Sequence, residues 1–278
     1  MAARPHDVGP LSFSVRVGYP SWPPARSVRY DTAAASVESS SMTLSAPPDR
    51  LISTIATNVA VVRARIDAAA WRADRNPADV RLIGVTKTFP AEVCNAALRA
   101  GVVDLGENRV QEGVAKAATL AAAGLEPTWH LIGHLQSNKV RPALEVFSLI
   151  HSVDSIDLAG AISRRATRPT EILLEVNVGD EPTKFGFPPQ AVGAALEAIM
   201  RLSNLSVRGL MTVAPASHDP ESVRPIFAQL RELARSLALR ELSMGMSGDY
   251  EVAVEEGSTM VRVGSALFGA RPAPVASS

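Results

Sequence analysis

Short apolar runs alternate with longer amphipathic segments along most of the chain. From Leu51 to Ile66, apolar residues recur at helical spacing and predict an opening helix over 50–73. Eight short apolar runs of strand length follow, at residues 81–85, 102–105, 129–133, 149–153, 172–178, 207–213, 241–244 and 260–263. The clearest helical stretches between them are 107–123, 188–202 and 221–238. The pattern therefore predicts a series of β-then-α units.

Eight such units in a row are typical of a (β/α)8, or TIM, barrel. An open doubly wound sheet more often stops at about five or six strands and carries a glycine-rich fingerprint after the first strand. Here the first run ends in Val85-Thr86-Lys87-Thr88, which lacks that fingerprint. We therefore expect one α/β domain, a (β/α)8 barrel over 50–272, with an N-terminal extension over 1–49 and a short tail over 273–278.

The extension is rich in Ser, Pro, Ala and Arg and has no sustained periodicity, so we expect it to be disordered. No apolar segment follows its early arginines, which argues against a secretory signal. Two alternatives stay open. One is an organelle transit peptide, which Asp7 and Asp31 argue against, and the other is a true start at Met42.

Charge balance and cysteine content narrow the partners and the compartment. The chain has 28 basic and 28 acidic residues, so no basic face for nucleic acid is expected. No apolar run reaches the roughly 18 residues of a membrane-spanning helix. Cys94 is the one cysteine, which excludes an intrachain disulfide and favours a reducing, cytoplasmic compartment. Because no catalytic motif surrounds Cys94, we interpret it as a buried core thiol.

Lysine is rare in this chain and limited to Lys87, Lys116, Lys139 and Lys184. Active sites of such barrels lie where the strands end, and Lys87 directly follows the first predicted strand. Partial desolvation there disfavours the ammonium and supplies the neutral amine that Schiff-base formation with an aldehyde requires. On position alone, a strand-end lysine that reaches solvent is the simpler interpretation.

The last two units change that balance. Phosphate sites in these barrels are often built by the loops after strands seven and eight. Ser247 follows the seventh run, and Gly264 and Ser265 follow the eighth, each just before a helical stretch. Backbone N–H groups at such a position, together with serine hydroxyls, suit an anion. Either serine alone would more readily be an ordinary helix cap. Both together, with Lys87 on the first strand, favour a phosphorylated aldehyde such as pyridoxal 5′-phosphate (PLP).

Arg262 lies inside the last apolar run, so it should point into the barrel or be paired. In a PLP site, its permanently charged guanidinium could hydrogen-bond the pyridine nitrogen and keep that nitrogen unprotonated. Such a ring is a weaker electron sink. The alternative is a salt bridge from Arg262 to Glu255 or Glu256.

Seven segments carry a resemblance to a known family. They are Val85-Thr86-Lys87, residues 106–112 (GENRVQE), residues 129–139 (WHLIGHLQSNK), Val176-Asn177-Val178, residues 208–211 (RGLM), residues 242–247 (LSMGMS) and residues 257–264 (GSTMVRVG). In this order, over about 50–271, the chain resembles the pyridoxal phosphate homeostasis proteins. That family binds PLP and has the barrel fold of the alanine racemase N-terminal domain.

The resemblance implies that Lys87 holds PLP as a Schiff base. It implies that Ser247, Gly264 and Ser265 bind the phosphate, that Arg262 faces the pyridine nitrogen, and that Asn108 and Asn177 line the pocket. The family is regarded as lacking robust catalysis and is associated with intracellular PLP balance. The chain departs from the family in its long extension and in Gly248 and Tyr250.

The resemblance and the residues favour a PLP carrier, with amino acids or apo-enzyme lysines as acceptors and a monomeric chain. The alternative is a PLP-dependent amino-acid racemase, which needs a base on each face of the cofactor. Alanine racemases take one base from a tyrosine of a C-terminal domain, and only seven residues follow Arg271 here. A metal-dependent hydrolase using His130, His134 and His151 is disfavoured, because Gly133 and a strand end break the helical spacing that a metal pair needs. We expect no metal site.

Overall fold

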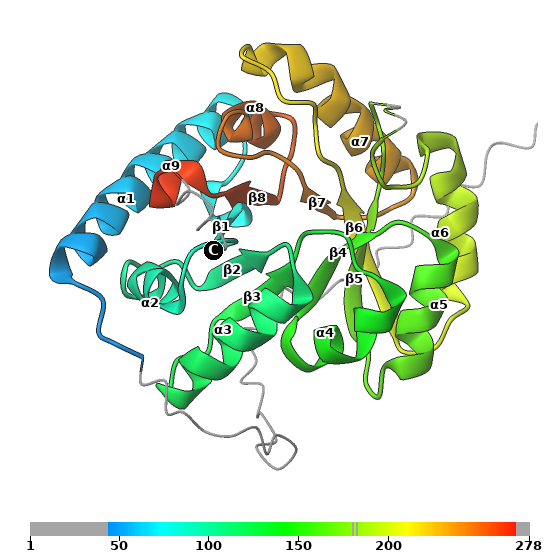
Figure 1. Cartoon of the computed structure of the whole chain (residues 1–278). Helices are drawn as coiled ribbons and strands as arrows, with labels where there is room; N and C mark the ends of the chain where they lie inside the picture. Colours follow the sequence, from blue (N-terminus) through cyan, green and yellow to red (C-terminus); the bar gives the residue numbers. More distant parts are fainter. Residues whose placement is uncertain (1–43, 180, 182, 271–278) are drawn as a thin grey trace, which may run out of the picture.

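The computed structural model describes residues 44–179, 181 and 183–270. Eight parallel strands follow one another around a closed barrel, and the last pairs with the first. Figure 1 shows the helices arranged outside this ring of strands. The predicted (β/α)8 barrel is therefore confirmed.

The strands are β1 Arg81–Val85, β2 Asp104–Glu107, β3 Thr128–Leu131, β4 Leu149–Val153, β5 Thr170–Glu175, β6 Leu205–Met211, β7 Glu241–Ser243 and β8 Met260–Val263. The helices are α1 Asp49–Arg72, α2 Ala91–Arg99, α3 Val110–Ala122, α4 Val140–Val146, α5 Ile156–Arg165, α6 Val192–Met200, α7 Arg224–Ser236, α8 Tyr250–Glu255 and α9 Ser265–Phe268. Short 3-10 turns are η2 Pro77–Asp79, η3 Ser137–Lys139, η4 Pro189–Ala191 and η5 Pro220–Val223.

Predicted and observed strands coincide at both ends for β1, β4 and β8. β5 and β6 begin two residues earlier than predicted, whereas β2, which was predicted over 102–105, runs Asp104–Glu107 and lies two residues later. Both of its terminal residues are acidic and buried, and both have cationic partners. The predicted strand ended before Glu107, because a hydrophobicity pattern does not extend a strand to a charged residue that is buried by ion pairing.

The apolar core lies mainly between the sheet and the surrounding helices, where Trp129 and Phe227 are among the largest fully buried side chains. A second, smaller apolar cluster joins residues of five different strands and fills the barrel interior. Its members are Ile83, Leu149, Leu173, Met211 and Met260. Buried polar side chains also lie inside the barrel, among them His130, His151 and Arg262, and they are the basis of the candidate site.

Helix α1 packs along α8 and α9, where it covers the barrel wall beside β1 and β8 (Figure 1). Its residues Ile66, Ala69 and Ala70 are fully buried in a cluster with Val254 and Leu267. The predicted opening helix over 50–73 is thus confirmed within one residue at each end. The packing ties the first helix to the last two elements of the barrel.

Cys94 is a buried free thiol, as predicted. Burial raises the pKa of Cys94 to about 12, so the thiol stays protonated at neutral pH. Among the described residues, no helix combines the length and the apolarity needed to cross a membrane. Predicted disorder over 1–49 falls on residues outside the described ranges except for 44–49, and the tail 273–278 lies entirely outside them.

Candidate functional site

Lys87 lies just beyond β1, at the rim where the parallel strands end. Thr86 N–H donates to the carbonyl of Gly106 at 3.1 Å, so sheet hydrogen bonding continues up to the residue before Lys87. Strand alternation puts Lys87 on the same face as Ile83, which packs inside the barrel. The Lys87 side chain is half-buried. This is the partly desolvated position at the barrel mouth that the sequence predicted.

The end of β8 lies next to the end of β1, because Gly84 is opposite Val263 in the parallel pair. Gly264 therefore follows β8 at the same rim as Lys87. Gly264 and Lys87 are far apart in the sequence, and the closed barrel brings them to adjacent loops.

Ser247, from the loop after β7, contacts this same rim. Its Oγ accepts hydrogen bonds from Gly264 N–H at 3.1 Å and from Ala266 N–H at 3.3 Å. Two backbone donors thus converge on one oxygen, which is what a phosphate oxygen needs. Ser265, between the two donors, is exposed. The structure brings together the residues of the predicted phosphate site.

Gly245 allows the loop after β7 to make this contact. Its φ is +92°, and a Cβ at this position would lie 2.5 Å from Cβ of Ala253. The Gly245 carbonyl accepts from Arg262 N–H at 3.0 Å, and Asp249 Oδ1 accepts from Met246 N–H at 2.5 Å. The loop that carries Ser247 is therefore held to β8 and capped by its own aspartate.

Arg262 is buried and donates to two groups inside the barrel. Its Nη1 donates to Ser243 Oγ at 2.5 Å and its Nη2 to the Thr212 carbonyl at 2.8 Å. Burial lowers the pKa of Arg262 to about 10, so the guanidinium stays charged at neutral pH. The alternative salt bridge to Glu255 or Glu256 is wrong.

Both glutamates are occupied by other arginines on the outside of the barrel. Glu255 lies 2.6 Å from Arg72 Nε and 2.6 Å from Arg224 Nη2, and Glu256 pairs with Arg224 and Arg231. Position in the sequence could not separate these cases, because β8 points alternate side chains to opposite sides of the sheet.

A buried hydrogen-bonded chain continues from Arg262 across the barrel. His151 Nδ1 lies 2.8 Å from Ser243 Oγ, and His151 Nε2 lies 3.0 Å from His130 Nδ1. His130 Nε2 lies 2.9 Å from Asp104 Oδ1. We call these five residues, Arg262, Ser243, His151, His130 and Asp104, the Arg262 chain.

The Arg262 chain is satisfied when both histidines are neutral. Burial lowers the pKa of both imidazoles, and for His151 repulsion from a protonated His130 and from Arg262 lowers it further. A neutral imidazole has one donor and one acceptor, so each hydrogen bond can run from Arg262 through Ser243 and the histidines to Asp104. The direction follows from the guanidinium, which can only donate, and the carboxylate, which can only accept.

The third histidine of the metal hypothesis lies elsewhere. His134 Nδ1 is 2.9 Å from Asp154 Oδ2, and its ring stacks on Phe185 with 4.0 Å between centroids. His130 and His151 instead bond to each other inside the barrel. Within the described ranges, no group of three or more His, Cys, Asp or Glu side chains could hold a metal ion.

Asn108 and Asn177 lie on loops at the same end of the barrel, and both are half-buried. Gly133 permits the approach of the Asn108 loop, because a Cβ there would lie 2.4 Å from the Asn108 carbonyl oxygen. The Asn177 amide bonds the backbone of Glu181 in both directions, at 2.9 and 3.2 Å. Asn177 therefore shapes the loop after β5.

Sequence reasoning missed Glu175, the last residue of β5. Burial and the neighbouring Asp154 charge raise the pKa of Glu175 to about 7, although Arg262 opposes the shift. A carboxyl group with this pKa exchanges a proton near neutral pH. The available signal was a charged residue inside the apolar run 172–178.

Sequence reasoning also passed over Lys116, although it is one of only four lysines. Its Nζ lies 2.7 Å from each of three acceptors, which are Glu107 Oε1, Glu112 Oε1 and the Thr86 carbonyl. We call Lys116, Glu107, Glu112 and Thr86 the Lys116 cluster. The i,i+4 spacing of Glu112 and Lys116 was the one available sequence signal.

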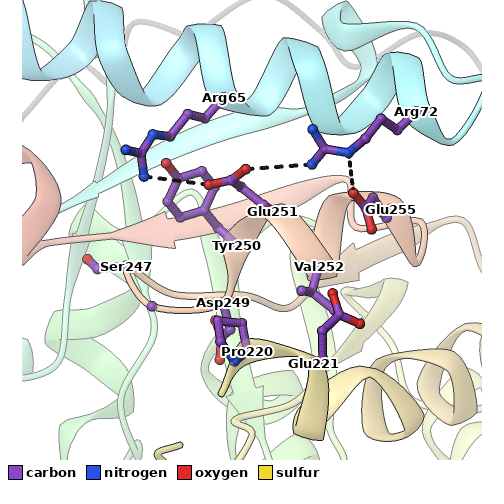
Figure 2. Close-up of a pocket in the computed structure, with 11 residues that line it drawn as sticks. Arg65, Arg72, Pro220, Glu221, Ser247, Asp249, Tyr250, Glu251, Val252 and Glu255 are labelled. Atoms are coloured by element: carbon purple, nitrogen blue, oxygen red, sulfur yellow. Dashed lines mark hydrogen bonds and ion pairs between the residues drawn. The ribbon is translucent and has the colours of Figure 1, made fainter. Parts of the chain in front are cut away.

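A pocket of about 350 Å³ lies beside the Ser247 loop, between α1, α8 and the turn before α7. Figure 2 shows Arg65 and Arg72 of α1 reaching Glu251 and Glu255 of α8 across its edge. Neither Lys87 nor Arg262 lines it. The pocket therefore shares Ser247 with the candidate site but lies outside the barrel mouth.

Comparison with known proteins adds an independent line of information. The sequence profile of the alanine racemase N-terminal domain matches residues 55–272. A protein of Pseudomonas aeruginosa named pyridoxal phosphate homeostasis protein is 46% identical over 225 residues, covering 79% of this chain and 97% of its own length.

This chain belongs to the pyridoxal phosphate homeostasis protein family. The resemblance predicted from the sequence is thus confirmed. A structure of PipY from Synechococcus elongatus PCC7942 with PLP bound matches with a TM-score of 0.67 and 39% identity, covering 77% of this chain and all of that one. A protein of Bifidobacterium adolescentis described as unknown matches with a TM-score of 0.76 and 41% identity, over 81% of this chain and all of its own.

Proposed function

We propose that this member of the family binds PLP through a Schiff base on Lys87 and serves in PLP homeostasis. The Lys87 amine would add to the PLP aldehyde, and loss of one water molecule would leave a C=N bond. A second amine could then replace the Lys87 amine on the carbon of this C=N bond. The support comes from the family membership and from the similarity to PipY, whose structure has PLP bound.

The observation that carries the proposal is the meeting of Lys87 with the Ser247–Gly264 contact at adjacent strand ends. One rim then offers an amine for the aldehyde and converging donors for the phosphate. Ser247, Gly264 and Ser265 are the proposed phosphate ligands, and Asn108 and Asn177 the proposed lining. Among the other lysines, Lys116 has all three ammonium hydrogens directed at acceptors.

Arg262 is the proposed partner of the pyridine nitrogen. Arg262 donates one N–H to Ser243 and one to the Thr212 carbonyl, so its remaining N–H groups can donate to the ring nitrogen. The guanidinium keeps its proton at neutral pH, so this hydrogen bond does not protonate the ring. A ring nitrogen that faces a guanidinium stays unprotonated and withdraws electrons weakly. This favours holding and releasing PLP over Cα chemistry.

A carrier fits the placement of Tyr250 better than a racemase does. Tyr250 is the one tyrosine within the described ranges, and it packs against α1 with Val62 and Ile66. It therefore lies outside the barrel wall, away from Lys87. A racemase needs a second base opposite the lysine. We propose a non-catalytic carrier whose acceptors are amines of amino acids or of apo-enzyme lysines.

The test is an absorption spectrum of the purified chain titrated with PLP, with Lys87→Ala as the variant. We expect a visible or near-ultraviolet band that saturates at one PLP per chain and is lost in Lys87→Ala. Addition of L-alanine should shift the band to that of PLP bound to the added amine, without loss of optical activity of the amino acid. A chain that takes up no PLP, or sustained racemisation abolished by Lys87→Ala, would contradict the proposal.

A further inference from the structure

We propose that Lys116 is a positioning residue for Lys87: it holds, with Glu107 and Glu112, the backbone on both sides of Lys87 in the geometry that presents the amine at the barrel mouth. The inference rests on the proposed PLP site at Lys87 and assigns a role to charged residues that do not reach that site themselves. Its basis is a set of contacts at the ends of β1 and β2.

The Lys116 cluster binds the two peptide groups that flank Lys87. Lys116 Nζ donates to the Thr86 carbonyl at 2.7 Å, which belongs to the peptide before Lys87. Glu112 Oε1 accepts from Thr88 N–H at 2.5 Å, which belongs to the peptide after Lys87. Because Lys116 also bonds Glu112 at 2.7 Å, one ion pair fixes both peptides at once.

The turn that follows Lys87 needs such a hold. Thr88 has a φ of +68°, in the left-handed region that β-branched residues rarely adopt. Such a conformation persists where the surroundings impose it. The Thr88 N–H bond to Glu112 reaches this residue from α3, and it is charge-assisted.

The buried end of the cluster is built to keep Lys116 charged. Glu107 is fully buried, and its Oε1 accepts from Lys116 Nζ at 2.7 Å and from Thr86 Oγ1 at 2.6 Å. Burial alone lowers the pKa of Lys116, but the carboxylates of Glu107 and Glu112 outweigh it and raise the pKa. Lys116 is thus an ammonium at neutral pH, in contrast to the neutral amine required of Lys87.

A purely structural role is the competing explanation, and the contact pattern separates the two. A buried ion pair is often no more stabilising than apolar residues of the same volume. This one directs its remaining donor and acceptor to the backbone around Lys87, and Glu107 Oε2 is left without a hydrogen-bond partner among the described residues. The arrangement favours local geometry over maximal hydrogen bonding.

The experiment compares four full-length variants with the wild type. Lys116→Met removes the ammonium, Lys116→Arg keeps a cation, and Glu112→Gln weakens the Thr88 contact at a partly exposed position. The matched control is Arg75→Met, which also removes a cation bound to two backbone carbonyls, those of Val254 and Ser258. Arg75 precedes β1, so it lies at the opposite end of the strand from Lys87.

Two readouts are measured on each folded variant. The first is the rate of PLP uptake on Lys87, followed by absorbance. The second needs no PLP and is amide hydrogen exchange at Thr88. We expect Lys116→Met to take up PLP about tenfold more slowly and Thr88 to exchange about tenfold faster, since a charge-assisted hold is lost. Glu112→Gln should show the same changes to a smaller degree, Lys116→Arg should recover part of the rate, and Arg75→Met should match the wild type in both.

The outcomes separate the inference from the proposed function. If the wild type takes up PLP on Lys87 and Lys116→Met and Glu112→Gln match its rate, the positioning role is refuted while the PLP site stands. Unchanged Thr88 exchange in both variants refutes it as well. If the wild type itself takes up no PLP, the proposed function fails, and the inference fails with it.

Discussion

Two sides of the barrel mouth hold their functional side chains by different means. On the β1–β2 side, the Lys116 cluster is ionic and grips backbone, and the cation in it is not the proposed reactive amine. On the β7–β8 side, the Arg262 chain binds the guanidinium of Arg262 directly and continues through two neutral histidines. The first arrangement fixes the backbone from which the Lys87 side chain projects. The second fixes the position of the Arg262 guanidinium.

The difference follows from what each side must keep. Lys87 needs a neutral amine, so a charge that contacted it directly would alter its pKa, whereas a charge that contacts only its neighbouring peptides acts mainly on geometry. Arg262 stays charged in any case and needs acceptors that leave its charge in place. Neutral imidazoles supply hydrogen bonds without adding a second buried charge beside it.

The largest expected effect on stability comes from a substitution in the Lys116 cluster. Lys116→Met leaves Glu107 as an uncompensated buried carboxylate, and we expect the free energy of unfolding to fall by about 3–5 kcal/mol. Lys116→Met combined with Glu107→Leu should restore most of that loss, because the buried charge is gone. Urea denaturation of the double variant and of the single variants Lys116→Met and Glu107→Leu is the measurement. A double variant as unstable as the sum of the two singles would contradict the ionic account.

Glu175 sharpens the comparison through pH, because it faces the charge at the end of the Arg262 chain. Its pKa is raised from 4.5 to about 7, so the folded protein keeps this proton in a range where the unfolded chain has lost it. The free energy of unfolding should therefore fall as pH rises from 4.5 to 7, by at most about 3 kcal/mol from this group.

Glu175→Gln should remove that part of the pH dependence and be the more stable protein above pH 7. Thermal or urea unfolding across pH 4 to 8 checks this. Equal slopes for the variant and the wild type would mean that Glu175 titrates at its ordinary pKa in the folded protein.

A substitution in the Arg262 chain should lower the free energy of unfolding by a smaller amount. Ser243→Ala removes the acceptor of Arg262 Nη1 and the hydroxyl beside His151 Nδ1, and leaving such buried groups unpaired costs about 1–3 kcal/mol. Ser236→Ala is the matched control, since the Ser236 hydroxyl bonds a carbonyl at an exposed site. We expect the control to stay within about 0.5 kcal/mol of the wild type. A Ser243→Ala protein as stable as the control would show that the Arg262 chain does not contribute to the free energy of unfolding.

The sequence was sufficient for the barrel, because strand-length runs at regular spacing reflect burial on both faces of a parallel sheet. It also located Lys87, Ser247 and Gly264, since strand ends and small residues before helices can be recognised locally. The Arg262 chain could not be predicted, because His151 of β4 and Ser243 of β7 meet only through the closure of the barrel. Side-chain alternation along β8 turns Arg262 inward, away from Glu255.

The most direct test of the central claim is borohydride reduction of the PLP-loaded chain followed by proteolysis and peptide mapping. Reduction converts the C=N bond to a stable amine and leaves the cofactor on the residue that carried it. We predict a single labelled peptide, with the label on Lys87 and none on Lys116, Lys139 or Lys184. A label on one of those three lysines, or no label after reduction of a chain that has bound PLP, would contradict the account.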